Sequence, residues 1–154
     1  MSPTQEVCVD ASLAVKVVVT EPDSDKADAL FDEWAYEGKQ LIAPAFFEVE
    51  TDSILRQKVM LRKELTLEQA EAAFAKLQTL PIQQIAVLGQ RQRAWEVAAN
   101  YGFATVYDAT YLALAELRGC EFWTADERLF NWVKDTLTFV KWLQNYIPKT
   151  ASPG

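Results

Sequence analysis

Four acidic residues stand beside apolar segments of this sequence, where a carboxylate is costly to bury unless something binds it. Asp10 follows the valine-rich run EVCV, Asp126 follows EFWTA, and Asp108 opens the apolar helical pattern YLALAELR. Glu48 lies near the start of another helical pattern, after LIAP. Taken singly, Asp108 and Asp126 are ordinary helix caps, Asp10 is a turn residue and Glu48 a solvated helix residue. Taken together, they raise the question of a shared site.

Clustered carboxylates have a specific chemistry. Four anions brought close together repel one another, and they take up protons or lower stability unless a cation lies among them. Oxygen-only ligands suit Mg²⁺ or Mn²⁺, which keep several waters and usually bind phosphate oxygens of a substrate. The chain has no histidine, which excludes Ser-His-Asp and Cys-His nucleophile systems and histidine-ligated zinc. Carboxylates and hydroxyls would therefore carry any catalysis, together with a hard cation.

Length and composition limit what surrounds such a site. The chain has 154 residues, half of them hydrophobic, so we expect one domain over residues 1–147 and a disordered tail over residues 148–154. The net charge of −7 argues against general binding of polyanions but not against a local phosphate site. Neither a membrane span nor a signal peptide is recognisable, so we expect a cytoplasmic protein with no membrane partner. Cys8 and Cys120, isolated in apolar segments, are interpreted as small buried side chains.

The elements that would position the acids alternate between strands and helices. Strands are predicted at residues 6–9, 40–44, 82–87, 120–126 and 138–143. Helices are predicted from Asp23 or Ser24 to Gly38, and over residues 46–61, 67–80, 91–102, 104–119 and 129–135, with Thr66 and Gln69 forming a capping box. This alternation predicts an α/β fold, with a mainly parallel central sheet between helices on both faces. Ligands bind such sheets at the carboxyl ends of the strands, where all four acids are expected.

The sequence also resembles a known family. The segments VDASLAVKVVVTEPDSDKA, APAFFEVETDSILR and YDATYLALAELRGCEFWTADERL are similar, in order and spacing, to PIN-domain ribonucleases, particularly the VapC-type toxins of toxin–antitoxin pairs. The resemblance runs from Val7 to about Leu143. It implies a three-layer α/β/α PIN-like fold and hydrolysis of RNA phosphodiester bonds with Mg²⁺ or Mn²⁺. It also implies a homodimer and, if one is encoded, an antitoxin protein, both bound through the region 46–80.

The resemblance assigns roles to residues. It implies that the metal-ligating and catalytic acids are Asp10, Glu48, Asp108 and Asp126, with the hydroxyls of Ser12 and Thr124 beside them. In that chemistry the acids hold one or two cations, a water is activated for attack, and charge on the phosphate is neutralised.

The sequence departs from the family pattern in one region. Thr51 stands where the family often has asparagine or a small residue, and the charges of Glu50 and Asp52 nearby are unusual. Asp52 shares a helix face with Glu48, and we interpret it as an exposed helix charge.

Binding of RNA would also need basic side chains that contact its phosphates, and the sequence offers several candidates. Any one of them alone is better explained as part of a solvated helix face. The candidates are Arg56, Lys58, Arg62, Lys63, Arg91 and Arg93, with Arg128 as a partner for a site carboxylate or a phosphate.

Two other functions remain open from the sequence. One is a PIN-like RNA-binding or scaffold module that does not cleave, which a metal-dependent cleavage assay would distinguish. The other is a haloacid-dehalogenase-like phosphatase, which would need a second aspartate where Ser12 stands, and no glycine-rich phosphate loop is present.

Overall fold

Five short strands form one sheet in the order β3-β2-β1-β4-β5, and every neighbouring pair is parallel. The structure is a computed structural model that describes residues 5–149. The strands are β1 (Glu6–Val9), β2 (Gln40–Ala43), β3 (Ile82–Gln84), β4 (Glu121–Thr124) and β5 (Val140–Trp142). The predicted parallel α/β sheet is confirmed.

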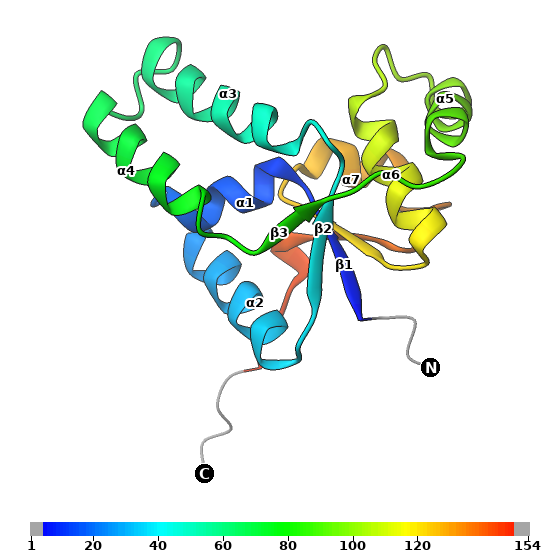
Figure 1. Cartoon of the computed structure of the whole chain (residues 1–154), viewed down its shortest axis with the longest axis horizontal. Coiled ribbons are helices and arrows are strands. Elements are labelled where there is room, and N and C mark those ends of the chain that lie inside the picture. The colour runs from blue at the N-terminus through cyan, green and yellow to red at the C-terminus, as the bar shows by residue number, and fades with distance from the viewer. Residues whose placement is uncertain (1–4, 150–154) are drawn as a thin grey trace.

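Helices occupy both sides of this sheet. In Figure 1, α1 to α4 gather to the left of the sheet, and α5 and α6 lie to its right. The helices are α1 (Ala11–Val18), α2 (Ser24–Tyr36), α3 (Phe47–Met60), α4 (Leu67–Leu77), α5 (Gln90–Tyr101), α6 (Tyr107–Arg118) and α7 (Glu127–Val133), followed by the 3-10 turn η1 (Leu143–Asn145). The arrangement has the three layers expected from the sequence.

Local signals placed most of these elements correctly. The capping box that begins α4 is present: the Thr66 hydroxyl accepts from the backbone N–H of Gln69 at 3.0 Å, and the Gln69 side chain accepts from the N–H of Thr66 at 2.9 Å. Helix α1 was not among the predicted elements. Its sequence, ASLAVKVV, is rich in β-branched valine, which favours strands, and burial of Ala11, Leu13 and Ala14 against the core outweighs that preference.

The core lies on both faces of the central strands. Val7, Cys8 and Val9 of β1 are all buried, as expected for a strand covered by helices on both sides. Cys120 is also buried and, like Cys8, is a free thiol.

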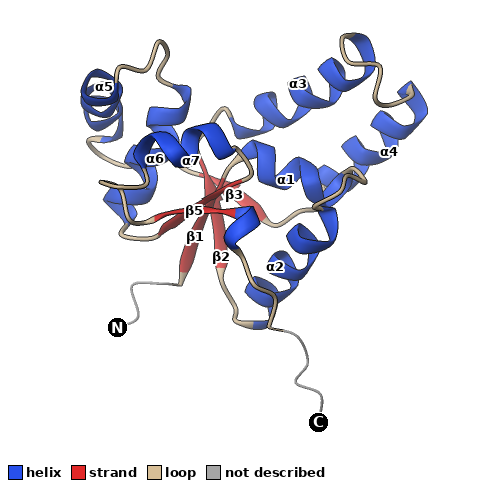
Figure 2. Ribbon diagram, turned by 180° about the vertical axis from the view of Figure 1, so that it is seen from behind, coloured by secondary structure: helices blue, strands red, loops and turns tan. Residues whose placement is uncertain are grey.

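A second, smaller cluster packs α1 against the hairpin formed by α3 and α4. Its buried residues are Val15, Val19, Leu55 and Ala73. Figure 2, seen from behind, shows this hairpin and the α5–α6 pair rising on opposite sides of the sheet.

The strand order reverses beside β1. From β1 the chain adds β2 and then β3 in one direction, and it later returns to add β4 and β5 on the other side of β1. The carboxyl ends of β1 and β4 therefore meet at the topological switch point, where open parallel sheets bind ligands. Asp10 follows β1 and Asp126 closely follows β4, so both acids lie at this point.

The C-terminal residues and the lengths of the helices bear on two further expectations from the sequence. The predicted disordered tail, residues 148–154, lies outside the described residues except for Pro148 and Lys149. Among the helices of residues 5–149, none combines the length and the apolar character required to cross a bilayer.

Candidate active site

Asp10 is the most buried acid at the switch point, with 7% of its surface exposed. Its backbone N–H extends the β1–β4 pairing by donating to the carbonyl of Trp123 at 3.0 Å. The residue occupies the N-cap position of α1, but its side chain caps nothing. Instead, Oδ2 accepts hydrogen bonds from the hydroxyls of Ser12 at 2.9 Å and Thr124 at 2.6 Å. Within the described residues no side chain donates to Oδ1, and the backbone of Ser12 also stabilises the ionised carboxylate of Asp10 through a hydrogen bond.

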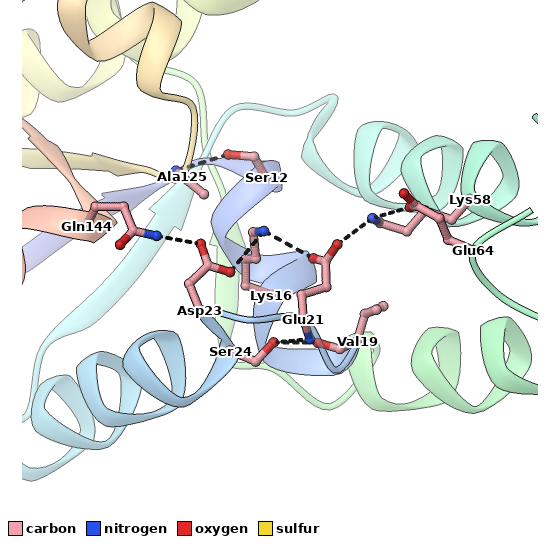
Figure 3. Close-up of polar contacts among 10 residues, drawn as sticks. All are labelled: Ser12, Lys16, Val19, Glu21, Asp23, Ser24, Lys58, Glu64, Ala125 and Gln144. Carbon is pink, nitrogen blue, oxygen red and sulfur yellow. Dashed lines mark hydrogen bonds and ion pairs between the residues drawn. The ribbon is translucent and has the colours of Figure 1, made fainter. Parts of the chain in front are cut away.

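The two hydroxyls join the ends of β1 and β4. Ser12 Oγ accepts from the N–H of Ala125 at 3.2 Å (Figure 3), and Thr124 Oγ1 accepts from the N–H of Asp126 at 2.9 Å. A hydroxyl has only one hydrogen to donate, and both donate it to Asp10. The 3.4 Å contact between Ser12 and Thr124 therefore adds no donation. The expected position of both hydroxyls beside Asp10 is what the structure shows.

Asp126 has a double role. It is the N-cap of α7, and its Oδ1 accepts from the N–H of Leu129 at 3.1 Å. The interpretation of Asp126 as a cap is therefore confirmed, yet its charge also raises the pKa of Asp10. Burial is the largest cause of the raised pKa of Asp10, and the hydrogen bonds from Thr124 and Ser12 oppose it.

Asp108 lies in the first turn of α6, whose N-cap is Val106, so it is not a cap. Burial raises its pKa to about 7, with further contributions from the charges of Asp10, Asp126 and Glu50. A first-turn acid normally benefits from the helix dipole. The reversal shows that burial and three neighbouring carboxylates dominate the electrostatics of Asp108.

The fourth acid of this group is Glu50, not the expected Glu48. Burial and the charge of Asp10 raise the pKa of Glu50, although the Tyr111 hydroxyl donates to its Oε1 at 2.6 Å and opposes the shift. Glu48 is exposed and bonded to Gln84, whose amide oxygen accepts from the Glu48 N–H at 2.9 Å and whose amide nitrogen lies 3.4 Å from Glu48 Oε1. The structure thus places Glu48 outside the group that contains Asp10, Asp108 and Asp126.

The hydrogen bond from Tyr111 adds a residue that sequence reasoning missed. Tyr111 is fully buried, and burial together with the charges of Asp10 and Glu50 raises its pKa. Its hydroxyl therefore stays protonated and holds Glu50. The available signal was its position three residues after Asp108, on the same face of α6.

Within the described part of the chain, no cation is paired with any of the four acids. Across residues 5–149, no lysine or arginine forms an ion pair with Asp10, Glu50, Asp108 or Asp126; the candidate partner Arg128 is one of those that do not.

Two other cations considered for RNA binding are held elsewhere. The ammonium of the buried Lys58 lies 2.8 Å from Glu21 and 3.1 Å from Glu64 (Figure 3), and Arg93 is paired with Glu116 and Glu96. Lys58 is therefore not a surface group that could contact RNA.

The donor set fits a hard divalent cation, because it offers only carboxylate oxygens and lacks an internal positive charge. As placed in the described part of the chain, no three acid or cysteine side chains stand close enough to hold a metal ion directly. Mg²⁺ keeps several of its waters, so carboxylates at a wider spacing bind it partly through those waters.

Comparison with known proteins agrees with this arrangement. A family model described as "PIN domain" matches residues 7–134. VapC ribonuclease Mb0985 of Mycobacterium bovis is 30% identical over 123 residues, or 80% of this chain and 87% of that protein. Ribonuclease VapC3 of Mycobacterium tuberculosis is 30% identical over 128 residues, or 83% of this chain and 88% of that protein.

A solved structure shows the same fold. Mycobacterium tuberculosis VapC20, described as a toxin that cleaves the sarcin–ricin loop, superposes with a TM-score of 0.58 and 17% identity, covering 84% of this chain and 95% of that chain. Because the family model spans most of the sequence and VapC relatives match it over most of their own length, the chain belongs to the PIN-domain family.

Proposed function

We propose that this chain is a ribonuclease toxin of a toxin–antitoxin pair, which hydrolyses RNA phosphodiester bonds with a divalent cation, Mg²⁺ or Mn²⁺, held by Asp10, Glu50, Asp108 and Asp126. The nuclease activity follows from the likeness to VapC ribonucleases. One observation supports the site: the four carboxylates at the switch point lie close enough that the pKa values of Asp10, Glu50 and Asp108 are each raised by the charge of at least one of the others, and no cation of the described chain is paired with them. We expect the protein to act in the cytoplasm, where its substrate is found.

The chain's own residues prepare this site. Ser12 and Thr124 hold Asp10 through Oδ2, and Oδ1 is the oxygen that we propose as the metal ligand. The Tyr111 hydroxyl holds Glu50 in the same way. These supporting hydrogen bonds fix the orientation of the ligating oxygens before anything binds. Glu48 is replaced by Glu50 in this proposal.

The proposed hydrolysis requires that the negative charge of the acids and of the RNA phosphate be neutralised. A bound divalent cation supplies activation of a water and neutralisation of charge on the phosphate. In the unliganded site about half of the Asp108 side chains hold a proton at neutral pH, because burial and the neighbouring carboxylates raise the pKa to about 7. A positive charge held among the acids would favour loss of this proton, so binding of a cation and ionisation of Asp108 would be coupled.

The α3–α4 hairpin is the proposed surface for the protein partners, a homodimer mate and a cognate antitoxin. It carries several large apolar side chains that remain exposed in the described chain, and exposed apolar surface is a common feature of interaction sites. They are Val49, Met60, Leu61, Leu67 and Phe74.

The function is tested by incubating the purified protein with a mixed RNA pool and Mg²⁺ or Mn²⁺, with EDTA and Asp10→Asn as controls. We expect cleavage that requires the cation and is lost in the variant, while circular dichroism shows that the variant remains folded. Undiminished cleavage by Asp10→Asn would contradict the proposed site. A folded, partner-free protein that binds RNA without cutting any of it would favour the binding-module alternative.

A further inference from the structure

A groove opens beside the acid cluster, between the start of α3 and helices α5 and α6. Its volume is about 990 Å³, within the range of ligand sites. Its lining includes three aromatic residues, Phe46, Trp95 and Tyr107. None of these three residues has a role in the proposed chemistry of the carboxylates.

The groove and the acid cluster share structural elements. Tyr107 immediately precedes Asp108 on α6. Phe46 packs edge-on against Tyr107 at 5.4 Å and against Tyr111 at 5.5 Å between ring centroids, and Tyr111 in turn holds Glu50. A molecule bound in the groove would therefore lie next to one bound at the acids.

Two of the rings are open to solvent. Trp95 is 68% exposed and Tyr107 is 54% exposed. Aromatic faces on a protein surface provide stacking platforms for unpaired bases, since every base has an apolar face of matching size. Arg91 also lines the groove, is exposed and forms no ion pair within residues 5–149, so it supplies a positive charge on a chain whose net charge is −7.

Gln90 gives the groove a group that can read a base. Its side chain is buried, with 9% exposed, and lines the groove. The amide oxygen accepts from the N–H of Val87 at 2.9 Å, which fixes the orientation of the amide. The amide nitrogen donates to no group in the described chain. Its two N–H groups can therefore donate to acceptors of the kind found on base edges.

From these features we infer that the groove receives one unpaired nucleotide of the RNA substrate, its base stacked on Trp95 and Tyr107, its edge bonded to the Gln90 amide and its phosphate near Arg91. This inference rests on the proposed ribonuclease function. The polar groups favour a nucleotide over an apolar protein side chain, which would cover the amide of Gln90 without satisfying it.

The test measures both RNA binding and cleavage. Binding is followed by fluorescence anisotropy of a labelled single-stranded RNA with a randomised hexamer, in a background carrying Asp10→Asn. Cleavage of the same RNA by otherwise intact protein is followed by sequencing the products. The variants are Trp95→Ala, Trp95→Phe and Gln90→Glu, which keeps the acceptor for Val87 but removes the donors.

Two matched controls lie at the opposite end of the sheet. Tyr36→Ala removes an aromatic side chain that is 93% exposed, and Gln40→Glu adds the same charge as Gln90→Glu at an exposed position beginning β2. Neither residue lines the groove.

We expect Trp95→Ala to weaken RNA binding and raise KM roughly tenfold with little change in kcat, and Trp95→Phe to restore most of the loss. Gln90→Glu should change which base is preferred at one position near the cut, and both controls should behave as the parent protein. Unchanged binding and preference in Trp95→Ala and Gln90→Glu would overturn the inference while leaving the ribonuclease intact.

Two outcomes separate the groove from the proposed function. If the protein binds RNA through Trp95 but cuts nothing, the nucleotide site stands and the ribonuclease proposal fails. If Trp95→Ala instead changes the sedimentation mass and leaves RNA binding unaltered, the groove is a protein interface and the inference fails.

Discussion

The Thr124 hydroxyl lies 2.6 Å from Asp10 Oδ2 and 2.9 Å from the backbone nitrogen of Asp126, so one small side chain joins two acids that follow neighbouring strands. Replacing it by valine keeps the shape but removes a donor to a buried carboxylate and an acceptor for a backbone N–H. We expect Thr124→Val to lower the free energy of unfolding by about 1–3 kcal/mol and cleavage by about 10- to 100-fold. Thr124→Ser, which keeps both hydrogen bonds, should retain most of the stability and most of the cleavage activity. Urea denaturation and cleavage rates measure the two effects, and a valine variant equal to the parent in both would show that the bond has no role.

Glu48 and Glu50 provide a direct comparison on one helix. Of the two, Glu50 has its pKa raised by the charge of Asp10 and accepts a hydrogen bond from the Tyr111 hydroxyl. We expect Glu50→Gln to reduce cleavage about 100-fold, because a neutral amide cannot replace a ligating carboxylate. Glu48→Gln should stay within about threefold of the parent, since this exposed side chain contacts Gln84. Initial rates on one RNA at saturating Mg²⁺ provide the measurement, and the reverse ranking would return Glu48 to the site.

Asp108 makes the metal-free protein's stability depend on pH. Its pKa is about 7 in the folded chain against an ordinary 3.8, so between these values the folded state holds a proton that the unfolded state has released. The free energy of unfolding should therefore fall as pH rises from about 4 to 7 and then level off, by on the order of 2 kcal/mol. Asp108→Asn should flatten this decline and be the more stable protein at pH 8. Thermal unfolding in EDTA across this range tests the sign, and an increase in stability through the same interval would refute it.

Glu21 gives the opposite pH dependence, far from the acids. Burial raises its pKa, but the hydrogen bond from Lys58 and the charge of Lys16 prevail and lower it below the ordinary 4.5. The unfolded state then binds more protons, so this contribution to stability is present above pH 4.5 and disappears as pH falls through the lowered pKa. We expect Glu21→Gln to cost about 1–3 kcal/mol at pH 7, because the ammonium of Lys58 is buried.

The matched control for Glu21 is Glu64, which also binds Lys58 but has 48% of its side chain exposed. Exposed ion pairs contribute less than about 1 kcal/mol, and Glu64→Gln should cost no more than that. Equal losses in the two variants, measured by urea denaturation, would mean that burial does not distinguish them.

Much of this architecture is predictable from local patterns, because those patterns are physical. Continuous apolar residues marked β1, and Thr66 with Gln69 marked the start of α4. The three aspartates were found from their positions after predicted strands and at the start of a predicted helix.

The choice between Glu48 and Glu50 was not predictable in the same way. The buried stripe of α3 runs through Phe47, Thr51 and Leu55, and the two glutamates border it on opposite sides, because residues two apart point about 200° from each other. Which border faces α6 depends on how α3 crosses the sheet, which is a property of tertiary packing. Sequence spacing alone therefore leaves both open.

The hydroxyls beside Asp10 have a consequence for how the proposed site would bind RNA. The hydroxyls of Ser12 and Thr124 each donate their single hydrogen to the same carboxylate oxygen. Each also accepts a hydrogen bond from a backbone N–H. Neither has a proton left for a phosphate oxygen of the substrate. The anchoring of Asp10 thus removes two neutral donors from the proposed site, and we expect an RNA strand bound there to take its hydrogen bonds from other residues.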